Sequence, residues 1–185
     1  MGPNVVGVRC NSGVVLFRLK KCETDTRRIF NWYPHRSRLY VTTFVGSALV
    51  YSQIFNNVWK EFGPLFATIS DCFEKFFRKE NCDNLLILGG GIENGQPVLH
   101  LFDMNFKKNI GNIFTIGEDA SHVGNLLKNH FDPQWDLDRL TKEVLKKLMQ
   151  SNVGCEFLEI VQVDFNSVKV FNTVEIQEMK NECQA

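Results

Sequence analysis

The sequence lacks an excess of charge of either sign. Its 185 residues carry 21 Lys and Arg against 21 Asp and Glu, so the formal net charge is zero. Proteins that bind nucleic acid or an anionic membrane surface usually present a basic patch or a net positive charge. We therefore expect no nucleic acid and no membrane among the partners. Zero net charge gives little self-repulsion, which suits a subunit that lives inside an assembly.

Long apolar runs are also missing. No stretch reaches the roughly 20 apolar residues that a bilayer-spanning helix requires. The first residues, Met-Gly-Pro-Asn-Val-Val-Gly-Val-Arg, form too short and too polar a run to predict a signal peptide. The sequence thus predicts a chain with no membrane segment and no secretory leader.

Closely spaced cysteine pairs are absent as well. The six cysteines stand at positions 10, 22, 72, 82, 155 and 183, with no CxxC pair. Structural zinc sites usually draw on such pairs, so we predict no metal residues and no cofactor. Three disulfides could form, but a domain of this size does not need them. Free thiols in a reducing compartment, the cytoplasm and nucleus, are the expectation.

Apolar and aromatic residues are what the sequence has in quantity. Hydrophobic residues make up 44% and charged residues 23%, which is ordinary for a soluble globular protein. The length predicts a single domain, residues 1–185. Sixteen Phe is a high number, and that much aromatic surface needs either a large core or an interface.

Eight segments have the composition of β-strands. Residues 5–9 and 13–19 flank an Asn-Ser-Gly turn, which predicts a hairpin. Residues 85–91 form a continuous apolar run that ends in glycines, which predicts a buried strand with 97–103 as its hairpin partner. The remaining strands are expected at 38–44, 111–116, 155–163 and 167–174.

Four helices are predicted, in two pairs. Ser47 can cap the first, whose inward face is expected to hold Leu49, Ser52, Phe55, Val58 with Trp59, and Phe62. Gly63-Pro64 ends it, and Pro64 suits the first turn of the second helix, whose apolar face is Leu65, Ile69, Cys72, Phe73 and Phe76. The third helix covers 120–131, with Val123, Leu126, Leu127 and Phe131 inward. Asp136 caps the fourth, which begins at Leu137 and turns inward Leu140, Val144, Leu145 and Leu148.

The order of these elements predicts the architecture. Strands, two helices, strands, two helices and two strands follow one another. Helices in pairs, rather than singly between strands, argue against a parallel doubly wound sheet. We therefore predict the α/β (α+β) class and a four-layer αββα sandwich, with two antiparallel sheets between helix layers.

Several segments, in their order and spacing, resemble the β-type subunits of the proteasome, which have the N-terminal-nucleophile hydrolase fold. The resemblance covers nearly the whole chain and lies in residues 5–9, 13–16, 28–30, 39–48, 84–90, 97–103 and 116–120. Within the family the chain is most similar to the non-catalytic fourth of the seven eukaryotic β-type subunits. The immediate start of the first strand and residues 84–90 and 126–133 carry that likeness.

Active members of this family use an N-terminal threonine as nucleophile, with its own α-amino group as base and a lysine that lowers the barrier. Here Met1, Gly2, Pro3 and Asn4 precede the first strand, and none has a hydroxyl or thiol. By the same resemblance the lysine falls on Arg28, which stays charged at neutral pH. The family's acidic residue falls near Leu19 or Lys20 and is missing, and its Gly-Ser-Gly turn is replaced by Gly117-Glu118-Asp119. Ser151 stands without the matching Asp and Ser pair expected around 150–155.

Other residues invite a functional interpretation that a structural one outweighs. Gly89, Gly90 and Gly91 lack the GK[ST] or GxGxxG context of a phosphate loop, and His35, His100, His122 and His130 lack metal-ligand spacing. Cys10 and Cys22 are expected to be incidental or core thiols, and Arg27, Arg28, Arg36 and Arg38 to pair at a surface or between subunits. Glu118 and Asp119 fit helix capping. Phe73, Phe76, Phe77 and Trp59 are expected in the core, with some acting as interface anchors.

The resemblance implies a non-catalytic structural subunit of the 20S proteasome core particle, with no catalytic, cofactor-binding or metal residues. Its partners would be other β-type subunits in a seven-membered ring, the α-type ring and the opposite β ring, within the chamber of ubiquitin-dependent protein degradation. Two alternatives remain open. One is an active N-terminal-nucleophile hydrolase whose Cys or Ser nucleophile, Cys10 or Cys22 for example, is exposed by processing. The other is a stand-alone binding domain on the same sandwich.

Overall fold

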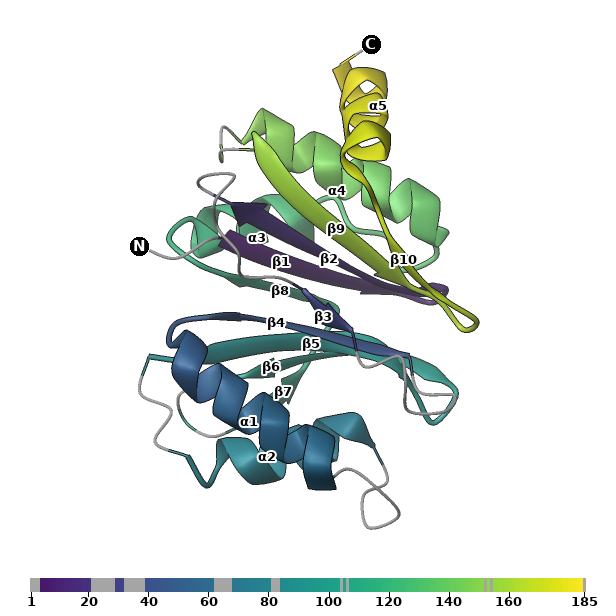
Figure 1. The fold of residues 1–185 in the computed structure, drawn as a ribbon. Coiled ribbons are helices and arrows are strands. Elements are labelled where there is room, and N and C mark those ends of the chain that lie inside the picture. Colours follow the sequence, from purple (N-terminus) through teal and green to yellow (C-terminus); the bar gives the residue numbers. More distant parts are fainter. Residues whose placement is uncertain are drawn as a thin grey trace.

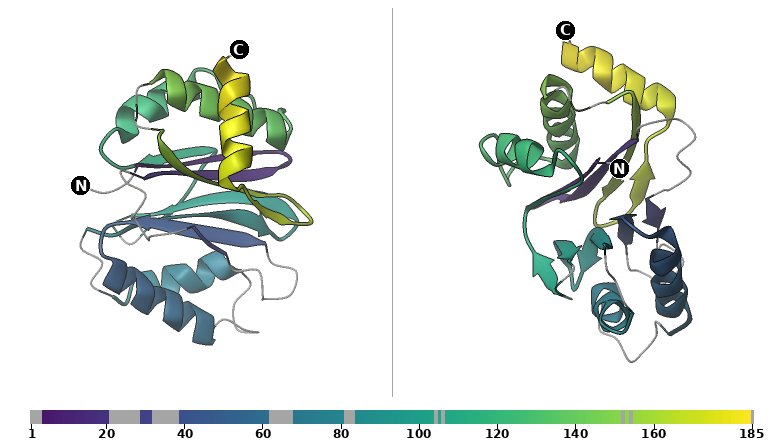
Figure 2. Two further views of the ribbon diagram at one scale, coloured as in Figure 1. Left: turned by 45° about the horizontal axis from the view of Figure 1, so that its top comes forward. Right: turned by 90° about the vertical axis from the view of Figure 1, so that its left-hand side faces the viewer.

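The computed structural model describes residues 4–20, 29–31, 39–61, 68–80, 84–103, 105, 107–151, 153 and 155–184. Two five-stranded sheets lie face to face, and helices cover the outer face of each (Figure 1, Figure 2). Every strand pair in the two sheets is antiparallel. The predicted four-layer sandwich of the α+β class is confirmed.

The first sheet has the strand order β10-β9-β2-β1-β8. Its strands are β1 (Asn4–Cys10), β2 (Gly13–Lys20), β8 (Ile113–Ile116), β9 (Phe157–Val163) and β10 (Val168–Val170). The predicted hairpin is β1 with β2, in a register that runs from Asn4 opposite Leu19 to Cys10 opposite Gly13. Because β1 and β2 lie inside this sheet, residues 4–20 form its centre.

The second sheet has the order β3-β4-β5-β6-β7. Its strands are β3 (Phe30–Asn31), β4 (Tyr40–Val45), β5 (Leu86–Glu93), β6 (Gln96–Phe102) and β7 (Lys108–Ile110). The predicted hairpin of the second sheet, β5 with β6, is confirmed. β5 does not stop at its glycines, however, but continues to Glu93, and the short edge strand β7 was not predicted.

Helices α1 (Ala48–Glu61) and α2 (Ile69–Phe77) cover the second sheet, whereas α3 (Ala120–Lys128) and α4 (Leu137–Gln150) cover the first (Figure 1). The predicted caps are present. Ser47 Oγ accepts from the Val50 amide at 3.3 Å, and Asp136 Oδ1 accepts from the Arg139 amide at 2.8 Å. A side-chain acceptor there satisfies an amide that has no partner within the helix.

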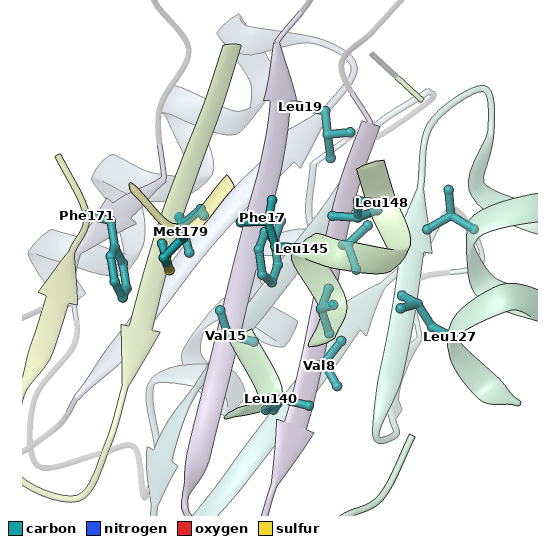
Figure 3. Packing of buried hydrophobic residues seen from close by; sticks show 14 of the residues in the cluster. Val8, Val15, Phe17, Leu19, Leu127, Leu140, Leu145, Leu148, Phe171 and Met179 are labelled. Atoms are coloured by element: carbon teal, nitrogen blue, oxygen red, sulfur yellow. The ribbon is translucent and has the colours of Figure 1, made fainter. Parts of the chain in front are cut away.

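Three apolar layers hold the sandwich together. The aliphatic layer lies between the first sheet and its helices, where Phe17, Leu140, Leu145 and Leu148 meet (Figure 3). The central layer lies between the sheets and includes Val14, Leu16, Leu88 and Leu99. The aromatic layer lies between the second sheet and α1 with α2; its aromatic members are Tyr40, Phe44, Tyr51, Phe73, Phe76, Phe77 and Phe102.

The orientation of α1 corrects the sequence prediction. The buried residues of this helix are Tyr51, Ile54 and Val58, while Leu49 is 71% and Trp59 42% exposed. Only Val58 of the predicted inward face is buried; Phe55 is half-buried, and Phe62 lies outside the described residues. The Tyr51 hydroxyl lies 2.7 Å from Thr42 Oγ1 on β4, and its ring stacks on Phe44. These contacts hold the Tyr51 side of the helix against the sheet.

The chain ends in a helix, α5 (Thr173–Gln184), where a strand was predicted to continue to Val174. Asn172 Oδ1 accepts from the amides of Val174 and Glu175, and Glu175 Oε2 accepts from the Asn172 amide. This reciprocal cap starts a helix, and the β-branched residues 168–174 had suggested a strand instead.

Leu65 and Pro64 of the second predicted helix lie outside the described residues, and Ile69, Cys72, Phe73 and Phe76 are buried as predicted.

Candidate functional site

The start of β1 is where the resemblance would place a nucleophile, and an amide side chain occupies it. Asn4 Nδ2 donates to Asp119 Oδ2 at 2.8 Å, and the Asp119 amide donates to Asn4 Oδ1 at 3.2 Å. Asp119 precedes α3, so this pair of hydrogen bonds ties the first strand to the start of that helix. A carboxamide is a weak nucleophile and is neither a general acid nor a general base at neutral pH. Its two hydrogen bonds to Asp119 make Asn4 a clasp between β1 and α3.

Gly117 makes this clasp possible. Its φ is +125°, and a Cβ there would collide with Asn4 Oδ1 and Asn4 Cα. Only glycine adopts this conformation without strain and leaves room for the Asn4 side chain. The Asp119 carboxylate makes no cap hydrogen bond to α3. Asp119 stands at the N-cap position of α3, but the predicted side-chain cap is missing, because its carboxylate accepts from Asn4 instead.

A buried cation, Arg18, lies on the second strand of the same hairpin. Arg18 is 0% exposed and pairs with Val5 across β1 and β2. Its Nη1 donates to Thr43 Oγ1 at 2.7 Å and to the Phe44 carbonyl oxygen at 3.4 Å. Glu159 is directly opposite Arg18 on β9, and opposed residues project to the same face of a sheet. An opposite charge on that face reduces the penalty of burying the guanidinium.

Sequence reasoning missed Arg18, although the signal was present. It is the one charged residue within the otherwise apolar run Gly-Val-Val-Leu-Phe-Arg-Leu of β2. Such a residue inside a strand buried on both faces predicts a buried ionic contact. Arg18 links the two sheets near the start of β1, so the buried cation and Asn4 of the clasp occupy neighbouring positions of the same hairpin.

The other residues named by the resemblance do not converge here, as far as the structure describes them. Leu19 is buried in the aliphatic layer, and Ser151 Oγ donates to the Leu148 carbonyl oxygen at 2.7 Å at the end of α4. Lys20, at the end of β2, lines a surface groove with Glu156 and Lys180. Arg28 lies outside the described residues, as do Arg27, Arg36 and Arg38.

A second polar cluster, not predicted from the sequence, joins α2 to the second sheet. Glu93 Oε1 accepts from the Ser70 amide at 2.9 Å, and Glu93 Oε2 accepts from Ser70 Oγ at 2.7 Å. Lys108 on β7 pairs with Asp71 at 2.6 Å. A carboxylate at a helix N-terminus is favoured by the helix dipole. Even so, burial raises the pKa of Glu93 above its usual value, partly offset by the Ser70 hydrogen bonds.

His100 lies behind this cluster and is the buried histidine of β6. Its Nδ1 is 3.0 Å from the Tyr40 hydroxyl, and its ring packs beside Phe102. Burial, with the positive charge of Lys108, lowers the pKa of His100 to about 4. Burial also raises the pKa of Tyr40 well above its usual value. His100 is therefore a neutral core histidine at physiological pH, as the structural interpretation had it.

The three glycines of β5 serve packing. Gly89, Gly90 and Gly91 pair with β4 on one side and β6 on the other, so they belong to a regular ladder. A Cβ on Gly90 would lie 2.6 Å from Val14 Cγ1 of the first sheet. Glycine there lets the two sheets approach closely. A phosphate loop presents free backbone amides, and this segment does not have that form.

The remaining histidines and cysteines are dispersed. His122 and His130 are exposed on and after α3, and His35 and Cys22 lie outside the described residues. Cys10 and Cys72 are buried free thiols, and burial raises the pKa of Cys72 to about 11. In the described part of the chain, no group of three or more His, Cys, Asp or Glu is placed to hold a metal ion. Over the same residues, no helix has the length and apolar character needed to cross a membrane.

The outer face of α1 is the most exposed apolar surface among the described helices that cover the second sheet. Leu49 projects into solvent, and the rings of Phe55 and Trp59 stack at 6.2 Å between centroids. Trp59 was predicted to be core or an interface anchor. Its position on the surface excludes the first of these roles in the isolated chain.

No protein-family model matches this chain, and no curated protein shows significant similarity to it.

Proposed function

We propose that this protein is a non-catalytic structural subunit of a proteasome-like particle, built on the β-type sandwich. The observation that carries the proposal is the occupant of the start of β1. In a fold of this kind an active enzyme needs a hydroxyl or thiol there, and this chain has Asn4, held by Asp119 on both sides of its amide group. Asn4 and Asp119 thus join β1 to the start of α3.

The placement of Cys10 argues against the hydrolase alternative. Cys10 is 3% exposed and ends β1, opposite Gly13 in the hairpin. Processing that made Cys10 the first residue would remove β1, which pairs with both β2 and β8. The first sheet would lose a central strand, so a protein activated in this way would not keep the fold.

In the proposed role the chain supplies shape. The two sheets form a rigid core, and the helices on either side offer faces to neighbouring subunits. Leu49 and Trp59 on α1 are large apolar residues left in solvent, and residues of this kind act as anchors when a partner buries them. We propose that this face contacts a neighbouring subunit of the particle.

Sedimentation of the native protein from its source tests the proposal. A ring subunit travels with a very large particle, whereas a stand-alone binding domain sediments near its own mass of 21.3 kDa. Recovery of the whole pool at that small size, under conditions that keep large assemblies intact, would overturn the proposal.

A matched pair of surface variants tests the contact face. Leu49→Gln on α1 should reduce incorporation into the particle severalfold, because it removes an apolar anchor. Val174→Gln, at an equally exposed apolar position on α5, should reduce it less. Equal incorporation of Leu49→Gln and wild type would remove α1 from the proposed interface.

Arg28→Ala tests the absence of catalysis. Particles that carry it should keep every peptidase activity per particle, because the hydroxyl that attacks the scissile bond would come from other subunits. A selective loss of one cleavage specificity at unchanged particle yield would show that this chain contributes to an active site.

A further inference from the structure

A groove of about 260 Å³ lies between α4 and α5, at the edge of the first sheet. Phe171 after β10 and Met179 of α5 form the apolar part of its lining, and both are labelled in Figure 3. Gln162 of β9 adds a polar side chain to it. Carboxylates stand around them: Asp138, Glu175, Glu178 and Glu182. Lys142 and Lys169 complete the lining, so the groove carries more negative than positive charge.

Gln162 presents an unused acceptor in this groove. The residue is 6% exposed, and its Nε2 donates to Thr141 Oγ1 at 2.6 Å, Leu137 O at 3.3 Å and Asp138 Oδ1 at 3.3 Å. The Thr141 hydroxyl itself donates to Leu137 O at 2.7 Å, so it can only accept from Gln162. With acceptors alone on that side, the amide orientation is fixed. Its Oε1 then points away from them and receives no hydrogen bond from any residue that the structure describes.

Two of the four carboxylates form no close ion pair with a described residue, although the charge of Lys142 also acts on Asp138. Lys142 pairs with Glu182 at 2.6 Å, and Lys169 pairs with Glu175 at 3.5 Å. No described Lys or Arg forms an ion pair with Asp138 or Glu178. Lys169 Nζ lies 4.2 Å from the centroid of the Phe171 ring, so this ring already attracts a cation at the rim. An acceptor that receives no hydrogen bond from the described chain, and two carboxylates outside the ion pairs, lie beside apolar side chains. Together they favour a cation on an aliphatic stem.

We propose that this groove binds an arginine side chain of a partner protein. A guanidinium has five N–H donors in one plane, which suits acceptors that come from three different elements: Gln162 Oε1, Asp138 and Glu178. Its methylene stem packs against Phe171 and Met179. The inference goes beyond the proposed function and does not depend on it, because it concerns a groove of this chain and any partner that presents arginine.

The test is an NMR titration of the full chain with N-acetyl-arginine amide, and with N-acetyl-citrulline amide as its neutral isostere. The arginine probe should shift the side-chain amide signal of Gln162 and the backbone signals of 178–179, and the citrulline probe should bind at least tenfold more weakly. Equal binding of both probes, or shifts spread evenly over the acidic surface, would overturn the proposal.

Variants locate the site. Glu178→Gln removes an exposed carboxylate of the groove and should weaken the arginine probe about tenfold, because hydrogen bonds to charged groups are worth more than neutral ones. Glu156→Gln is the matched control, an exposed carboxylate outside this groove, and should leave binding unchanged. Gln162→Met should also weaken binding by removing the acceptor. If Glu178→Gln has no more effect than Glu156→Gln, the proposal fails, whatever becomes of the Gln162 variant.

Discussion

The aliphatic layer and the aromatic layer, each between a sheet and its helices, differ in side-chain composition. Among the described residues, the buried aromatic members of the aliphatic layer are Phe17 and Phe171, with Phe131 and Trp135 half-buried against it. The aromatic layer contains seven buried aromatic residues. Aliphatic side chains ask only for close packing. Tyrosine and histidine also bring polar atoms that need partners once buried. The aromatic layer therefore needs hydrogen-bond partners for its polar atoms as well as close packing.

Polar contacts within the aromatic layer show the consequence. The Tyr40 hydroxyl is paired with His100, and the Tyr51 hydroxyl with Thr42. Each pair joins elements distant in sequence or spans sheet and helix. In the aliphatic layer the buried polar contacts are those of Gln162 and Thr141 at its edge. We therefore expect the aromatic layer to respond more strongly to substitution and to pH.

The largest expected effect is the loss of a ring from the aromatic layer. Phe102 is fully buried and contacts the rings of Phe73 and Phe77 at 5.9 and 6.1 Å. Phe102→Ala should lower the free energy of unfolding by about 4 kcal/mol, and Leu145→Ala in the aliphatic layer by about 3 kcal/mol. Urea denaturation measures both. A larger loss in the aliphatic variant would reverse the comparison.

The next effect is the pH dependence due to His100. The pKa of His100 is about 4 in the folded state, below the ordinary 6.5. Between these two pH values the unfolded chain binds a proton at this histidine and the folded chain does not. Above pH 6.5 His100 is neutral in both states and does not lower the free energy of unfolding. As pH falls from 6.5 toward 4, His100 lowers the free energy of unfolding by at most about 3 kcal/mol. Glu93, with its raised pKa, contributes with the opposite sign.

Replacement of His100 measures its contribution to the pH dependence of the free energy of unfolding. His100→Gln should lose less stability than wild type between pH 6.5 and 4, measured by urea denaturation at several pH values. His122→Gln, at an exposed position on α3, is the control and should keep the wild-type slope. An unchanged slope in His100→Gln would show that this histidine does not set the acid sensitivity of the aromatic layer.

Helix caps on the two sides should differ by a smaller amount. Thr68 caps α2, is buried, and also lies 3.1 Å from Ser70 Oγ, whereas Asp136 caps α4 in a more exposed setting. Thr68→Ala should cost about 2 kcal/mol and Asp136→Ala about 1 kcal/mol in thermal or chemical unfolding. Equal costs would mean that burial adds nothing to the Thr68 cap.

The smallest effect is expected on the solvent-exposed face of α1. Leu49→Gln should change the free energy of unfolding by about 0.5 kcal/mol or less, because the side chain is exposed. Ile54→Ala, on the buried face of the same helix, should cost about 3 kcal/mol. Similar losses in the two variants would indicate that the sequence-predicted face of α1, and not the observed one, is inward.

Local signals were enough for much of this fold. The Asn-Ser-Gly turn between β1 and β2, the apolar run of β5 and the cap at Asp136 each concern residues a few positions apart. Their outcome depends on backbone chemistry that neighbouring residues dictate, so these predictions are confirmed. The pairing of helices between groups of strands then predicted the four layers. The capping box at Asn172 was equally local, and α5 could have been found from it.

Other features depended on contacts between distant parts of the chain. α1 has two apolar stripes, and the choice between them is made by Thr42 and Phe44 on β4. The clasp of Asn4 with Asp119 joins positions 115 residues apart, and the groove at Gln162 exists only where α4, α5, β9 and β10 meet. The sequence alone determined which segments become strands and helices, since periodicity and capping act over a few residues. Only the tertiary structure decided which face of a helix is buried and which polar groups meet, because burial and pairing depend on partners that the order of residues does not reveal.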